Sequence, residues 1–112
     1  MELVVDELPG GFTRAALAGR MDVEGALEVD DRFRELSSLR RKLIIDLSGV
    51  SFMASMGLRT LMVSARSLAN IGGRMTLANP QPNVESVLET SGIGELVGVH
   101  RSIDEAVAAL TS

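Results

Sequence analysis

The chain has 112 residues, of which 46% are hydrophobic and only 3% aromatic, and its formal net charge is −4. This length and composition predict one folded domain with an aliphatic core. The negative charge disfavours binding to nucleic-acid phosphates, the three phenylalanines are too few to stack single-stranded bases, and the lack of cysteine excludes disulfides and thiolate chemistry.

The first part of the chain predicts two strands followed by a helix. The segments MELVVDEL and FTRAALAG flank Pro9-Gly10-Gly11, a combination typical of a tight turn. Apolar residues then recur at intervals of three and four, which indicates a helix with one buried face. The residues of this stripe are Ala26, Val29, Phe33, Leu36 and Leu39.

The middle of the chain predicts a buried strand and a second helix. The run Leu43–Ile45 is short, continuous and rich in β-branched residues, which favours a central strand that ends at Asp46. A second apolar stripe follows and stops at Asn70-Ile71-Gly72-Gly73, a sequence suited to a helix end. Its members are Leu58, Leu61, Met62, Ala65, Leu68 and Ala69.

The last third predicts a strand, a helix, a strand and a final helix. RMTLAN is the strand, and Pro82 and Gly92 suit the start and the end of the helix after it. ELVGV is the last strand, and Ser102 with Glu105 forms a capping box before the final helix. The order β-β-α-β-α-β-α-β-α predicts a single α/β domain over residues 1–112, with a central mixed sheet flanked by helices.

Enzyme chemistry finds little support in these residues. Ser55 lies in MASMG, which lacks the first glycine of a G-x-S-x-G nucleophile elbow, and the only histidine is His100. One histidine and scattered carboxylates do not make a metal site, and no Walker lysine follows the glycine pairs. We therefore expect a protein that is not an enzyme and that carries no metal or cofactor.

Ser55 lies between the central strand and the second helix, and two interpretations are open. It is either the N-cap of that helix or a place where a phosphate is accepted, because the N-terminus of a helix favours negative charge. Gly57 would let another backbone approach closely. Arg59, one turn further along, is spaced to reach a phosphate on Ser55.

Three segments of the chain are similar to a known family. LIIDLSGVSFMASMGLRTLMVSAR resembles the central motif of the STAS domain, the anti-sigma-factor antagonist family, which is written DLSGVSFMDSSGL after a hydrophobic strand. LAGRMDVEGA resembles the family's L-x-G-E-L-D segment. IGGRMTLANPQPNVESVLETSGI resembles its GG…L…P…V…L…GL stretch, so the similarity covers nearly the whole chain in order.

The resemblance implies a small bacterial, cytoplasmic regulator that works by partner switching. In this family an anti-sigma serine kinase binds the unphosphorylated antagonist, releases its sigma factor or other client, and phosphorylates a serine that maps onto Ser55. A PP2C-type phosphatase restores the unphosphorylated form. Ala54 replaces the family's aspartate, and Met56 replaces its second small residue. The free protein is expected to be a monomer, without direct contact with nucleic acid and without insertion into a membrane.

The resemblance also implies a partner-binding surface around the phosphoacceptor Ser55. Asp22 falls on the aspartate of the family's first motif, and either caps the helix that begins near Val23 or meets an arginine of the partner; both roles are compatible. An alternative function is a STAS accessory subunit of an ABC lipid transporter or other membrane-associated complex, without regulation by phosphate. The expected partner-binding residues are Asp22, Met53, Ala54, Met56, Gly57 and Arg59.

Overall fold

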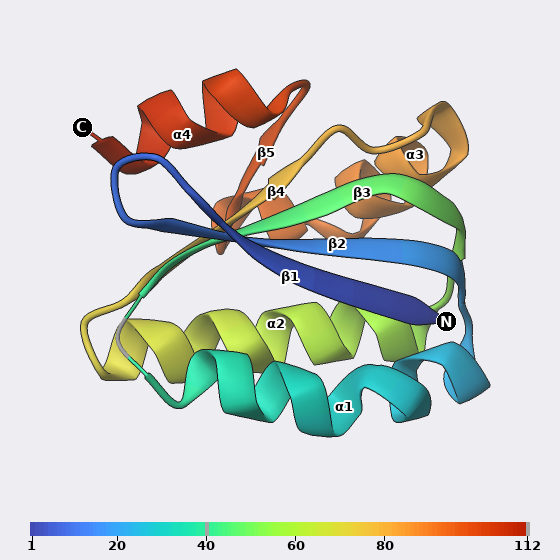
Figure 1. The fold of residues 1–112 in the computed structure, drawn as a ribbon. Coiled ribbons are helices and arrows are strands. Elements are labelled where there is room, and N and C mark those ends of the chain that lie inside the picture. Colours follow the sequence, from blue (N-terminus) through green and yellow to red (C-terminus); the bar gives the residue numbers. More distant parts are fainter. Residues whose placement is uncertain (40, 112) are drawn as a thin grey trace.

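The computed structural model of the protein describes residues 1–39 and 41–111. A five-stranded sheet has the strand order β1-β2-β3-β4-β5, in which β1 and β2 are antiparallel and the other neighbours are parallel (Figure 1). The strands are β1 (Glu2–Leu8), β2 (Phe12–Met21), β3 (Lys42–Met53), β4 (Arg74–Ala78) and β5 (Gly98–His100). The helices are α1 (Val23–Ser37), α2 (Ser55–Asn70), α3 (Pro82–Ser91) and α4 (Ile103–Thr111), with a 3₁₀ turn η1 (Ile93–Glu95). The predicted order of strands and helices is confirmed.

Helices cover both faces of the sheet. In Figure 1, α1 and α2 lie side by side below the strands and α4 lies above them. The buried residues of α1, α2 and α3 belong to one large hydrophobic cluster, whereas α4 closes a smaller cluster on the opposite face with Phe12, Ile44 and Ala78. The structure is therefore a three-layer α/β domain whose main core lies on the side of α1, α2 and α3.

The central strand β3 is buried on both faces, as its apolar run predicts. Leu43 and Ile45 face the large cluster, while Ile44 between them faces the small one. Successive side chains of a strand point to opposite faces, so a strand covered on both sides needs a continuous apolar run. This strand fixes the position of the chain that follows it.

Three element boundaries differ from the prediction. β3 does not end at Asp46 but continues to Met53, because β2 pairs with it along this extension as far as the pair Met21 and Met53. Leu39 lies beyond the end of α1 and is 61% exposed, so it does not belong to the buried stripe. The predicted strand ELVGV begins only at Gly98, since Glu95 belongs to the 3₁₀ turn.

The helix ends follow the predicted signals closely. Pro82 occupies the first turn of α3, and Gly92 ends that helix in the left-handed conformation with φ 74°. The Ser102 hydroxyl accepts the Glu105 N–H over 3.1 Å, and the Glu105 carboxylate accepts the Arg101 N–H over 3.1 Å. The capping box is thus present, with the carboxylate reaching one residue further back than the usual pattern.

Candidate functional site

The site lies where β2 and β3 end and α2 begins. The Ala54 N–H donates to the Met21 carbonyl over 3.0 Å, and the Ala54 carbonyl accepts the Leu58 N–H over 3.2 Å. Ala54 is therefore the N-cap of α2, and no side chain caps this helix. Ser55 is the first residue inside the helix, so its interpretation as the N-cap is wrong.

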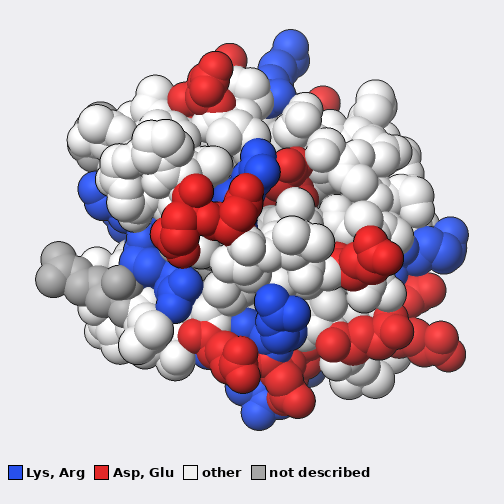
Figure 2. All heavy atoms as spheres, in the orientation of Figure 1, with Lys and Arg blue, Asp and Glu red and all other residues white. Residues whose placement is uncertain are grey.

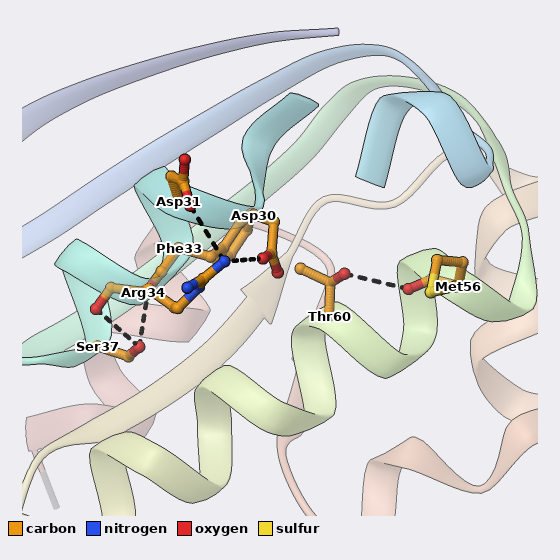
Figure 3. A network of polar contacts seen from close by, with 7 residues as sticks. All are labelled: Asp30, Asp31, Phe33, Arg34, Ser37, Met56 and Thr60. Carbon is orange, nitrogen blue, oxygen red and sulfur yellow. Dashed lines mark hydrogen bonds and ion pairs between the residues drawn. The ribbon is translucent and has the colours of Figure 1, made fainter. Parts of the chain in front are cut away.

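The Ser55 side chain is exposed, and its hydroxyl forms no hydrogen bond with the described residues. Elsewhere on α2, the Thr60 hydroxyl donates to the Met56 carbonyl over 3.1 Å, as Figure 3 shows. Within residues 1–39 and 41–111, no side chain or carbonyl forms a hydrogen bond with the Ser55 hydroxyl. A group that is exposed and free of internal bonds is available to a modifying enzyme.

Two grooves open beside Ser55. The α2–α3 groove has a volume of about 430 Å³ and is lined by Ser55, Leu58, Ser86, Val87, Thr90 and Ser91. The α1–α2 groove has a volume of about 250 Å³ and is lined by Ala26, Leu27, Asp30, Met56, Arg59, Thr60 and Val63. Ser55 and Arg59 are one helical turn apart, yet they line different grooves, so the start of α2 forms the ridge between the two.

Met53 and Gly57 lie beneath this surface. Met53 is 3% exposed. A Cβ atom on Gly57 would approach the Met53 Sδ to 2.6 Å and the Met21 carbonyl oxygen to 2.9 Å. The close approach that the sequence predicted at Gly57 is therefore made by the protein's own strand ends. Both residues hold α2 against the sheet and shape the ridge from below.

Asp22 is the N-cap of α1, as one of its two interpretations predicted. Its carboxylate accepts the Gly25 N–H over 2.8 Å, and its other oxygen lies 3.6 Å from the Arg20 Nε. The Gly25 hydrogen bond, followed by the positive charge of Arg20, lowers the pKa of Asp22 below its usual value. The Arg20 guanidinium also stacks over the Phe52 ring at 4.3 Å, so Asp22 belongs to a cluster at the ends of β2 and β3.

Side-chain bonds from the start of α3 brace the last part of β3. The Gln81 amide donates to the Ser48 carbonyl over 2.9 Å, and the Asn83 amide donates to the Ser51 carbonyl over 2.8 Å. The Asp46 carboxylate accepts the Ser48 N–H over 3.0 Å, a local bond from a side chain to the backbone. Sequence reasoning missed Gln81 and Asn83, although amide side chains directly before and after Pro82 are a usable signal.

The remaining chemical groups are distant from this ridge or absent from the described chain. His100 lies on β5 and lines neither groove. In the described ranges, no three His, Cys, Asp or Glu side chains come together where they could hold a metal ion. No helix in this part of the chain is long and apolar enough to cross a membrane.

The family of the chain follows from comparison with known proteins. The family model of the STAS domain matches residues 7–106. The chain belongs to the STAS domain family. Among its relatives, BtrV of Bordetella bronchiseptica is classed with the anti-sigma factor antagonists and is 28% identical over 97% of this chain and 94% of its own length. The resemblance seen in the sequence is therefore confirmed.

Solved structures of STAS proteins share the fold. An anti-sigma factor antagonist from Mycobacterium paratuberculosis has a TM-score of 0.89 at 20% identity, covering 99% of this chain and 94% of its own. SpoIIAA of Bacillus has a TM-score of 0.77 in its unphosphorylated form and 0.69 in its phosphorylated form, at 21% and 20% identity, over at least 96% of both chains. The STAS domain of a SulP transporter from Vibrio cholerae has a TM-score of 0.75 at 28% identity, covering 93% of this chain and 84% of its own.

Proposed function

We propose that this STAS protein is an anti-sigma factor antagonist that binds an anti-sigma serine kinase and is switched off by phosphorylation of Ser55. The observation that carries the proposal is the position of Ser55 in the first turn of α2, exposed, free of internal hydrogen bonds and on the ridge between two grooves. The antagonist relatives and the phosphorylated form of SpoIIAA support it by analogy.

A phosphate at Ser55 would change binding without changing the fold. The first N–H groups of a helix lack partners inside the helix, and the helix dipole favours negative charge at this end. A phosphate adds a charge of about −1.5 to −2 at neutral pH, which is costly to desolvate in an interface beside Met56. The phosphorylated protein therefore keeps its structure and loses its partner.

Ala54 changes the environment of Ser55 in a specific way. An aspartate at this N-cap position would accept one of the first N–H groups of α2 and would place its own negative charge beside the phosphate. Alanine provides neither the acceptor nor the charge. The N–H groups at the start of α2 are thus left available to a phosphate on Ser55 or to a carboxylate of the partner.

The proposed partner surface combines the exposed part of the ridge with its supports. The accessible residues are Asp22, Ala54, Met56 and Arg59. Met53 and Gly57 are buried and contribute indirectly, because their packing determines how closely α2 approaches the strand ends. The remaining parts of the proposal are a PP2C-type phosphatase that restores the active form, a cytoplasmic location and a monomeric free protein.

The experiment that tests this proposal is phosphorylation in vitro. The purified protein is incubated with ATP and a candidate serine-kinase anti-sigma factor from the same genome, and the product is mapped by mass spectrometry. We expect one phosphate, located on Ser55 and absent in Ser55→Ala. A kinase that binds tightly but leaves Ser55 unmodified would contradict the switch and indicate a constitutive antagonist.

A second candidate function is a STAS accessory subunit of an ABC lipid transporter or other membrane-associated complex, without phosphate regulation. The similarity to a transporter STAS domain and the replacement of the family's aspartate by Ala54 favour it. Stable co-purification with a transporter ATPase, together with no phosphate incorporation by any anti-sigma kinase of the same genome, would favour this function over the first.

A further inference from the structure

Large aliphatic side chains gather around the α1–α2 groove and remain exposed. Val23 and Leu27 on α1 are 53% and 65% exposed, and Val63 on α2 is 50% exposed. Leu27 and Val63 line the groove together with Met56. On α1 the two residues are four positions apart, and on α2 Met56 and Val63 are seven apart, so each pair follows one face of its helix.

The fold itself does not need these side chains. The buried face of α1 is already supplied by Val29, Phe33 and Leu36, which belong to the large core cluster. The other exposed large hydrophobic residues of the described chain are spread over two strands and three connections, as is normal for a protein surface. A group of aliphatic side chains around one groove is instead typical of an interaction surface.

Among the charged residues that line the groove, the acidic Asp30 is ion-paired within α1, whereas the basic Arg59 forms no ion pair with the described residues. Asp30 lines the groove and faces α2, but its carboxylate is paired with Arg34 at 2.6 Å, and Arg34 also lies 3.1 Å from Asp31 (Figure 3). On the opposite wall, no carboxylate of the described residues lies within 4.0 Å of Arg59. Figure 2 shows several acidic side chains, with basic ones between them, along the lower edge of the molecule, where α1 runs. A negatively charged group of a partner is therefore expected to contact Arg59, on the α2 side of the groove.

The geometry of the α1–α2 groove favours a helix of the partner over a strand. Its walls are two helices that run in the same direction (Figure 1), and helices have no free backbone edge to which a strand could add. A third helix fits between two helices when it offers apolar side chains at intervals of three, four and seven. A carboxylate on that helix would form an ion pair with Arg59.

We infer that the α1–α2 groove binds an amphipathic helix of the anti-sigma kinase, which packs aliphatic side chains on Leu27 and Val63 and places a carboxylate at Arg59. The inference rests on the proposed function and names the contact that the kinase makes. It also connects the groove to the switch, because Arg59 is one turn from Ser55. A phosphate on Ser55 competes with the carboxylate of the partner for this arginine.

The chain contains no cysteine, so single cysteine variants report on one position each. An environment-sensitive dye is attached to Leu27→Cys and, as a matched control, to Leu39→Cys, since Leu39 is 61% exposed and lies at the opposite end of α1. The probe is a purified candidate serine-kinase anti-sigma factor from the same genome. We expect a blue shift of the emission at position 27 on addition of the kinase and no shift at position 39. Binding of the kinase without a shift at position 27 would overturn the inference.

Substitutions give an independent test. Leu27→Asp and Arg59→Glu are expected to weaken kinase binding by at least about tenfold, the loss typical of central interface residues, whereas Arg59→Lys and Leu39→Asp retain it. Thermal unfolding of each variant verifies that it is folded.

The outcomes separate this inference from the proposed function. If the unaltered protein binds no anti-sigma kinase, the proposed function fails and the inference with it. If the unaltered protein binds but Leu27→Asp binds equally well, the inference alone fails. A loss with Val87→Asp and none with Leu27→Asp would move the contact to the α2–α3 groove. A concentration-dependent dimer that Leu27→Asp dissolves would assign the groove to a second copy of the chain.

Discussion

Ala54 and Asp22 occupy equivalent positions at the starts of α2 and α1, and only Asp22 forms a side-chain cap. Both residues have extended backbone conformations suited to an N-cap, with ψ 171° at Ala54 and −166° at Asp22. The difference between the two helices is therefore the side chain itself. The first turn of α2 therefore has no side chain that accepts its N–H groups, whereas the first turn of α1 has the Asp22 carboxylate.

A capping residue at position 54 should stabilise the protein. Ala54→Asp and Ala54→Asn are each expected to raise the free energy of unfolding by about 1 kcal/mol, since both side chains accept an N–H group of the first turn. Urea unfolding of the three proteins at neutral pH measures this. The asparagine variant separates the cap from the charge, and three identical midpoints would contradict the account of an uncapped α2.

The cap at Asp22 should depend on pH. Its pKa is lowered in the folded protein, so its stabilising effect is complete above the usual value of 3.8 and is lost as the pH falls through the lower folded value. The difference in unfolding free energy between the unaltered protein and Asp22→Ala should therefore be largest near neutral pH and shrink below pH 3.8. A difference that stays constant as the pH falls well below 3.8 would show that the carboxylate is not the capping group.

At the scale of secondary structure, the sequence was most informative where one local signal decides the outcome. The apolar run of β3, the glycine after α3 and the capping box of α4 each predicted the observed element. The extension of β3 to Met53 depends on pairing with β2, a long-range contact that no local pattern reveals. The same limit applies to the site, because Met53 and Gly57 share a motif with Ser55 but are buried by packing against Met21.

The docking of α2 on the strand ends should tolerate no side chain at position 57. Gly57→Ala gains helix propensity but places a methyl group within 2.9 Å of the Met21 carbonyl oxygen, which belongs to a strand and cannot move freely. We expect a net loss of about 1–3 kcal/mol of unfolding free energy, as for overpacked cores. Gly94→Ala is the matched control, since a Cβ there meets no atom within 4 Å. Equal stability of the two variants would contradict the packing described.

For the whole molecule, the proposed switch at Ser55 would be a local event on a rigid support. The ridge at Ser55 rests on β2 and β3, the central strands of the main core, and bonds from Gln81 and Asn83 fix the last part of β3. No movable lid or hinge is needed for a phosphate on the ridge to exclude a partner. Under the proposed function, a partner would contact the phosphorylated or unphosphorylated Ser55 directly at the surface.

A charge at Ser55 should therefore leave the fold unchanged. Ser55→Asp is expected to keep the free energy of unfolding within about 1 kcal/mol of the unaltered protein, because an acidic residue in the first turn is favourable or neutral. Backbone amide chemical shifts should change only near the start of α2 and the two grooves. Shift changes that spread to α4 on the far face of the sheet would indicate a conformational switch instead.

The most direct test of the central claim is a calorimetric titration of an anti-sigma kinase with the protein in defined phosphorylation states. The unphosphorylated protein and Ser55→Ala should bind with similar affinity, and the protein phosphorylated on Ser55 should bind at least about tenfold more weakly, since its charge cannot be desolvated in the interface. Equal affinity of the phosphorylated and unphosphorylated proteins would contradict the proposal that Ser55 is the switch.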